Sequence, residues 1–204
     1  MKLSRILLLL LIIILAVDLA LTPTPAIGST EDPRVAQSRE LIAAFGSELK
    51  YELQKAMGSG GPAAAVKVCR DRSPQIASKL SRKSGASVGR TSLRFRNPGN
   101  APEPWQAEQL RAFDQLAETT PAEQPLEAVQ AIDGELRYMR AIRTEPLCLV
   151  CHGSAVSPDV ARSLRADYPH DRATGYAQGQ VRGAFRVVWP AKGSSEDSSA
   201  GSSE

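Results

Sequence analysis

The sequence has few side chains that bind metals and little net charge. Its 204 residues include three cysteines and two histidines, and the formal net charge is +3. So small a charge gives no reason to expect binding to nucleic acid or to a membrane surface. No internal repeat is present, and residues 191–204, rich in Ser, Gly and acidic side chains, are expected to form a disordered tail. One domain with a substantial core is therefore expected over residues 29–190.

One long apolar run occurs, close to the N-terminus. A short basic start precedes the run Ile6–Val17, and Asp18 ends it. This order is typical of a secretory signal peptide, and the run is short for a membrane span. We therefore assign residues 1–28 to a signal peptide, which would serve as an N-terminal membrane anchor if it stays uncleaved. Either outcome places the domain outside the cytoplasm, as in a bacterial periplasm.

The sequence Cys-Leu-Val-Cys-His-Gly begins at Cys148. Its C-x-x-C-H pattern is that of covalent c-type haem attachment, in which Cys148 and Cys151 form thioethers with the haem vinyl groups. His152 would then be the proximal ligand of the iron. A zinc site needs a second pair of ligands, and only Cys69 and His170 remain. A thioredoxin-like site needs a βαβ context, which the pattern here does not show. We predict one covalently attached haem c.

Periodicity predicts helices in the first part of the chain and strands in the second. Apolar residues recur at helical spacing first and at a period of two later. The expected helices are 31–57, 62–73, 74–83, 102–116 and 157–164, and the expected strands are 86–96, 126–132, 136–142 and 184–189. Asp133-Gly134 predicts a hairpin turn between two of these strands. The order indicates an α+β fold with a long N-terminal helix.

Cys69 is the candidate distal ligand of the iron. Once the other two cysteines carry haem, it is an odd cysteine in an oxidising compartment, where a thiol is seldom kept without a role. Its neighbours Lys67, Arg70 and Arg72 favour the thiolate, which is the form that binds metal. The alternatives are a buried unreactive cysteine and an intermolecular disulfide.

Three other side chains compete for the distal position. His170 lies in a polar turn, where a solvated imidazole is the usual outcome. Met57 and Met139 have the side chain that many electron-transfer cytochromes use. Their places on an apolar helical stripe and in a strand favour core packing instead.

Arginines alternate along the expected strand 86–96. Arg90, Arg94 and Arg96 fall on one of its faces. Guanidinium groups bind carboxylates in a bidentate manner, so these three are candidate ligands of the haem propionates. A solvated strand face is the alternative.

Several sequence blocks together resemble one known family. They are residues 61–69, 88–98 and 148–153 and the glycine-rich stretch 175–185. The family consists of exported haem c proteins classed as a domain of unknown function with a PAS-like fold. It is related to periplasmic sensor modules of histidine kinases and chemoreceptors. The resemblance covers about Val35 to Trp189.

The resemblance implies a fold and a ligand set. The fold is an antiparallel sheet of about five strands flanked by helices, and the axial ligands are His152 and Cys69. No role for His170 follows from it. With both axial positions filled, the iron has no open position for peroxide chemistry, so an enzyme is not expected.

Two functions fit these expectations. One is a redox-responsive or gas-responsive sensor, in which release of Cys69 from the iron changes the position of its helix. The other is a small periplasmic electron-transfer cytochrome c. No kinase or methyl-accepting segment follows Trp189 in the sequence, so a signal would leave through contact with an unidentified redox or signalling protein.

Overall fold

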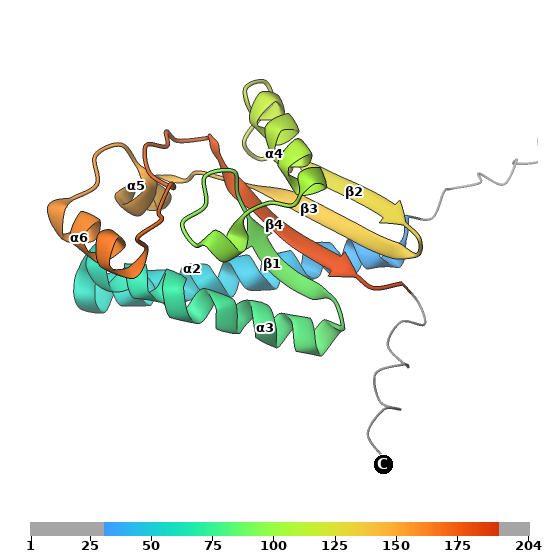
Figure 1. Ribbon diagram of the computed structural model, residues 1–204, viewed down its shortest axis with the longest axis horizontal. Coiled ribbons are helices and arrows are strands. Elements are labelled where there is room, and N and C mark those ends of the chain that lie inside the picture. The colour runs from blue at the N-terminus through green and yellow to red at the C-terminus, as the bar shows by residue number, and fades with distance from the viewer. Residues whose placement is uncertain (1–30, 192–204) are drawn as a thin grey trace, which may run out of the picture. The chain divides into compact units, whose positions relative to one another are not determined.

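The computed structural model describes residues 31–191, which form a mixed α/β domain with a long N-terminal helix (Figure 1). The expected signal peptide, residues 1–28, and the expected tail beyond residue 191 lie outside the described residues. Within 31–191 no helix is long and apolar enough to cross a membrane. In chain order the elements are α2 (Pro33–Lys67), the π-helical turn η1 (Val68–Arg72), α3 (Ser73–Ser84), β1 (Ser87–Thr91), η2 (Pro98–Asn100), α4 (Pro104–Ala117), β2 (Glu127–Ile132), β3 (Glu135–Arg143), α5 (Pro146–His152), α6 (Pro158–Asp167) and β4 (Val181–Trp189).

The sheet is antiparallel with strand order β1-β4-β3-β2. The resemblance implied about five strands, whereas residues 31–191 form four named strands. The predicted hairpin is confirmed: β2 and β3 are joined at Asp133-Gly134, where φ is 49° and 81°. Positive φ at both central residues gives a turn that matches the right-handed twist of the strands.

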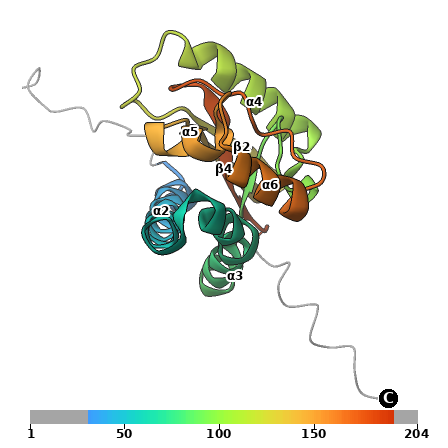
Figure 2. The same cartoon turned by 90° about the vertical axis from the view of Figure 1, so that its left-hand side faces the viewer.

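Helices cover both faces of the sheet, as Figures 1 and 2 show: α2 and α3 lie on one face and α4 on the other. Phe45 of α2 and Ile76 of α3 pack with Tyr138 of β3. Phe113 of α4 packs with Met139 on the opposite face. Neighbouring strand residues point to opposite faces, so the adjacent Tyr138 and Met139 are each 0% exposed in a different core. Met139 is a core residue, as predicted.

The first helix is longer than predicted. It begins after Asp32, whose side chain accepts a hydrogen bond from the Arg34 backbone N–H at 2.9 Å. The glycines after Met57 keep a helical path, so the helix does not end there as predicted. The break comes at Gly61, with φ 70° and ψ −174°, and Pro62 starts the next helical stretch.

Cys69 lies in η1, a five-residue π-helical turn between α2 and α3, and not in the α-helix predicted over residues 62–73. The backbone N–H of Ser73 bonds to the Val68 carbonyl across this turn. Such turns are rare and frequently occur at functional sites.

The strand predicted over residues 86–96 was too long, because β1 ends at Thr91. The Ser92 N–H donates to the Asn100 carbonyl at 3.0 Å, which turns the chain away from the sheet. Arg94 and Arg96 therefore lie in a loop and do not share a strand face with Arg90. The last strand, in contrast, begins at Val181, earlier than the predicted residue 184.

Candidate functional site

The Cys-x-x-Cys-His segment forms a short helix, α5, which periodicity did not predict. Pro146 begins it, where a missing N–H does no harm, and His152 ends it. Cys148 and Cys151 are half-buried free thiols. Burial raises the pKa of both thiols, so they are protonated at neutral pH.

The segment 173–176 holds the end of α5 through its backbone. The Tyr176 N–H donates to the His152 carbonyl at 2.9 Å, and the Gly175 N–H donates to the Gly153 carbonyl at 2.9 Å. The Ala173 carbonyl lies 2.6 Å from His152 Nδ1. A carbonyl can only accept, so Nδ1 carries the proton and Nε2 keeps its lone pair for a metal.

His152 is neutral in this environment. Burial lowers its pKa well below the usual value, and the nearby charges of Arg182 and Arg96 lower it further. The hydrogen bond to the Ala173 carbonyl opposes this shift without reversing it. Neutral imidazole is the form that coordinates a metal.

A cavity of about 1020 Å³ is lined by residues of α2, η1, β1 and α5. This volume is at the upper end of the range for ligand pockets, about 300–1,000 Å³. The cavity brings together the four residues that the sequence singled out for the iron and its attachment, which are Cys69, Cys148, Cys151 and His152. Apolar side chains that line it include Ile42, Phe45, Leu49, Leu53, Val66 and Phe185.

The three candidate arginines differ in their positions. Arg90 and Arg96 line the cavity, whereas Arg94 is exposed outside it, over the ring of Tyr176 at 4.1 Å. Arg90 Nη2 donates to Ser73 Oγ at 2.6 Å. Only the first two arginines are therefore placed to meet a ligand in the cavity.

Arg96 is buried and its charge is balanced. It donates to the Cys151 carbonyl at 2.6 Å and forms an ion pair with Asp171 at 3.1 Å. These contacts tie the loop after β1 to α5 and to the segment that contacts His152.

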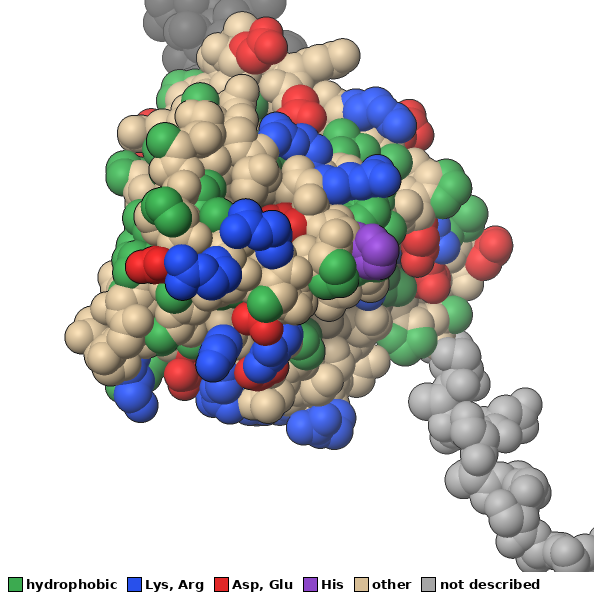
Figure 3. Space-filling model, turned by 60° about the vertical axis from the view of Figure 1, so that its left-hand side comes forward, with side chains coloured by type: hydrophobic (Ala, Val, Ile, Leu, Met, Phe, Trp, Pro, Cys, Tyr) green, Lys and Arg blue, Asp and Glu red, His purple; other side chains and the backbone are tan. Residues whose placement is uncertain are grey.

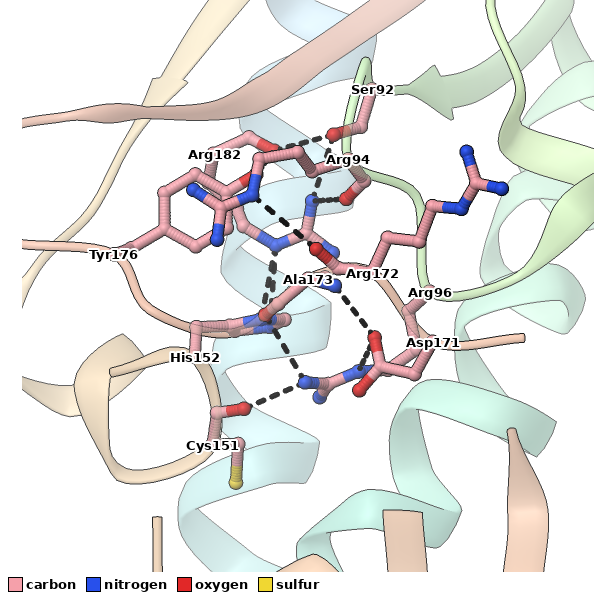
Figure 4. A network of polar contacts seen from close by, with 10 residues as sticks. All are labelled: Ser92, Arg94, Arg96, Cys151, His152, Asp171, Arg172, Ala173, Tyr176 and Arg182. Atoms are coloured by element: carbon pink, nitrogen blue, oxygen red, sulfur yellow. Dashed lines mark hydrogen bonds and ion pairs between the residues drawn. The ribbon is translucent and has the colours of Figure 1, made fainter. Parts of the chain in front are cut away.

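Arg182 is the cavity residue that sequence reasoning missed (Figure 4). Its Nε lies 3.0 Å from His152 Nδ1, and its Nη1 donates to Ser92 Oγ at 3.0 Å and to the Arg94 carbonyl at 3.3 Å. Burial lowers the pKa of its guanidinium to about 10. The residue lies within one of the blocks that carry the family resemblance, but it precedes the predicted strand, so no face could be assigned to it.

The other ligand candidates lie in different surroundings. Met57 lines the cavity and is half-buried. His170 is exposed beside a separate surface depression that includes Phe95 and Arg172. Over residues 31–191 no group of three or more His, Cys, Asp or Glu side chains could hold a bare metal ion.

The residues that line the cavity fit a haem. The two half-buried thiols could attach the vinyl groups, and His152 presents a neutral imidazole with Nε2 unprotonated. The apolar lining suits the macrocycle, and the guanidinium group of Arg90 suits a propionate. Cys69 completes a set of two possible axial ligands.

Comparisons with known proteins identify a family and a similar fold. The crystal structure of the cyanobacterial haem protein Tll0287 is similar, with a TM-score of 0.61 and 22% sequence identity over 79% of this chain and 97% of that chain. A comparison with curated protein sequences gave no match. Residues 27–190 match the family described as Tll0287-like. The chain therefore belongs to the Tll0287-like family.

Proposed function

We propose that this protein binds one haem c in the large cavity. Cys148 and Cys151 attach it, His152 is the proximal ligand and Cys69 is the distal ligand. The observation that carries the proposal is that a single cavity is lined by all four residues, although Cys69 lies far from the others in the sequence. The fold similarity to a cyanobacterial haem protein supports it.

The position of Cys69 supports its role as a ligand. Cys151 of α5 packs against the cluster that contains Val66, which lies three residues before Cys69 in the chain. Since Cys69 and Cys151 line the same cavity, a macrocycle tethered at Cys151 lies within reach of Cys69. Bound haem would supply one-electron redox chemistry and, with a free axial position, the binding of diatomic gases.

Of the two functions, the sensor is favoured by the way Cys69 is held. The π-helical turn of Cys69 connects α2 to α3 directly, and Ser73, the first residue of α3, accepts a hydrogen bond from Arg90 of β1. Making or breaking a bond between Cys69 and the proposed iron would therefore shift α2, α3 and the edge strand β1. The alternative is a small electron-transfer cytochrome c, in which this turn stays fixed in both redox states.

The proposal includes further parts that follow from the sequence. They are export to a periplasm with or without an N-terminal anchor, a PAS-like relationship of the fold, an unidentified redox or signalling protein as partner, and no enzymatic activity.

The face turned toward the viewer in Figure 3 carries Lys and Arg side chains interspersed with acidic ones. A partner would thus meet charges of both signs there.

Replacement of Cys69 by Ala tests the ligand assignment. The ferric wild-type protein should be low-spin with a thiolate signature in its absorption and electron paramagnetic resonance (EPR) spectra. Cys69→Ala should lose this signature and keep its covalent haem, measured as the pyridine haemochrome. Met57→Leu, which changes the other sulfur in the cavity, should keep the wild-type spectrum. A thiolate spectrum in Cys69→Ala, or its loss in Met57→Leu, would contradict the assignment.

Reduction under carbon monoxide distinguishes a sensor from a carrier. In a sensor, the ferrous form should lose its thiolate ligand and bind carbon monoxide within the mixing experiment. A carrier should exchange electrons without ligand loss and give no carbonyl band. Covalent haem missing from protein matured with the attachment machinery would refute the proposal as a whole.

A further inference from the structure

We propose that Arg182 is a positioning residue for the proximal ligand: its guanidinium holds the imidazole plane of His152 and raises the reduction potential of the iron bound there. The inference rests on the proposed haem site. It concerns a residue that makes no bond to the iron and acts only through His152.

The contacts around His152 give Arg182 a defined place. Nδ1 already donates its proton to the Ala173 carbonyl at 2.6 Å. The Nε of Arg182 lies 3.0 Å from Nδ1 and 3.5 Å from Nε2, so it is close to both ring nitrogens at once. Figure 4 shows the guanidinium directly above the imidazole. Because Nδ1 has no free lone pair, this contact restricts the ring by packing and charge, and not by a second hydrogen bond.

The guanidinium is itself fixed from several sides. Ser92 Oγ and the Arg94 carbonyl accept from Nη1 at 3.0 and 3.3 Å. The Tyr176 ring lies 5.5 Å from its central carbon, at cation–π distance. A side chain held in this way can hold its neighbour, since little further ordering entropy is lost when the imidazole packs against it.

The charge of Arg182 is not balanced by an acid. Within residues 31–191 it takes part in no ion pair, and its bonds go to a hydroxyl and a carbonyl. Arg96 is the contrasting case, because Asp171 balances it at 3.1 Å. A half-buried positive charge beside the proximal ligand disfavours the ferric state, which carries one positive charge more than the ferrous state. Arg182 therefore raises the potential that a thiolate ligand lowers.

The test uses the haem-loaded full chain with three substitutions. Arg182→Met removes both the charge and the planar guanidinium group. Arg182→Lys keeps the charge but removes the planar group. Arg172→Met is the matched control. Arg172 lies in the same loop as Ala173, is exposed, does not line the cavity, and has its guanidinium 5.3 Å from the Phe95 ring. The readouts are the midpoint potential and the anisotropy of the ferric low-spin EPR signal, which reports ring orientation.

Arg182→Met should have a lower midpoint potential and altered EPR anisotropy. Arg182→Lys should keep a potential near that of the wild type with altered anisotropy, and Arg172→Met should match the wild type in both. If Arg182→Met fails to fold, Ser92→Ala, which loosens the guanidinium without removing it, should still alter the anisotropy. Unchanged spectra and potentials in haem-loaded Arg182 variants would overturn this inference alone, whereas a wild-type protein without covalent haem would overturn the proposed function.

Discussion

Two arginines near His152, the buried Arg96 and the half-buried Arg182, show how contacts decide the role of a charged residue. Arg96 donates to the Cys151 carbonyl and pairs with Asp171, so its main effect is to join the loop after β1 to α5 and to the loop of Asp171. Arg182 has neutral hydrogen-bond acceptors and lies against an imidazole, so its charge acts on that ring. An isolated buried charge has a much larger effect on its neighbours than a paired one.

Glu127 is a second residue whose environment can be tested. Burial by itself would raise its pKa, but hydrogen bonds from Arg39 at 2.8 Å and Tyr138 at 2.6 Å lower the pKa below its usual 4.5. A carboxyl with a lower pKa in the folded than in the unfolded protein stabilises the fold above its unfolded pKa. That stabilisation is lost as the pH falls through the folded pKa.

Glu127→Gln should therefore lower the free energy of unfolding by about 1 kcal/mol at pH 7. The loss should be no larger because a partly exposed ion pair, such as that between Arg39 and Glu127, contributes no more than this to stability. The difference between variant and wild type should vanish once the pH has fallen through the folded pKa, because the wild-type carboxyl is then protonated in both states. Urea unfolding between pH 3 and 7 measures both effects. The exposed Glu118→Gln should follow the wild-type curve, and a pH-independent difference for Glu127→Gln would refute the explanation.

At the scale of elements, the approach of β4 to the end of β1 places Arg182. Gly183, the next residue, lies so close to β1 that a Cβ there would be 2.5 Å from the Thr91 carbonyl oxygen and 3.0 Å from Ser92 Cβ. The first of these is a backbone atom, which cannot move without shifting the strand. The glycine thus permits the contact between Arg182 and Ser92.

Gly183→Ala should destabilise the protein by about 1–3 kcal/mol, which is the usual range for a side chain forced into a packed site. Gly58→Ala is the matched control, because nothing lies within 4 Å of a Cβ in that helical position. It should stabilise the protein by about 0.5–1 kcal/mol through the better helix propensity of alanine. Thermal and urea unfolding give both values, and equal stabilities for the two variants would show that the approach of the strands is not tight.

For the molecule as a whole, the proposed haem would add to the packing of the fold around the cavity. Two cores on opposite faces of the sheet contain Tyr138 and Met139 at 0% exposure and need no ligand. The cavity of about 1020 Å³ is lined by residues of α2 and α5, and the segment 173–176 holds the end of α5. The proposed macrocycle would give α5 a further apolar contact beyond the cluster against which Cys151 packs.

Haem-free protein, produced as the Cys148→Ser/Cys151→Ser variant, should therefore melt on the order of 10 °C lower than the haem-loaded protein, since each 1 kcal/mol corresponds to about 2–4 °C at this size. Hydrogen exchange should accelerate at the amides of Gly175 and Tyr176. The amides of the central strands β3 and β4 should stay protected. Equal melting temperatures with equal protection at Tyr176 would show that the cavity is stable when empty.

The sequence by itself determined those features that depend on neighbouring residues. The Asp133-Gly134 hairpin follows from the positive φ that these two residues tolerate, and the haem prediction follows from the fixed spacing of Cys148, Cys151 and His152. Most of the α-helices also follow from local periodicity, although α5 and the π-helical turn at Cys69 do not, and the glycines after Met57 moved one boundary.

Only the tertiary structure decided which distant residues meet at the cavity. The alternation of arginines predicted one strand face, but the hydrogen bond from Ser92 to Asn100 ends β1 early and separates Arg90 from Arg94. Arg182 reaches His152 because β4 pairs with β1, and pairing between strands far apart in the chain is set by the packing of the whole sheet. Contacts of this kind depend on the buried surfaces of several elements at once, so no local pattern contains them.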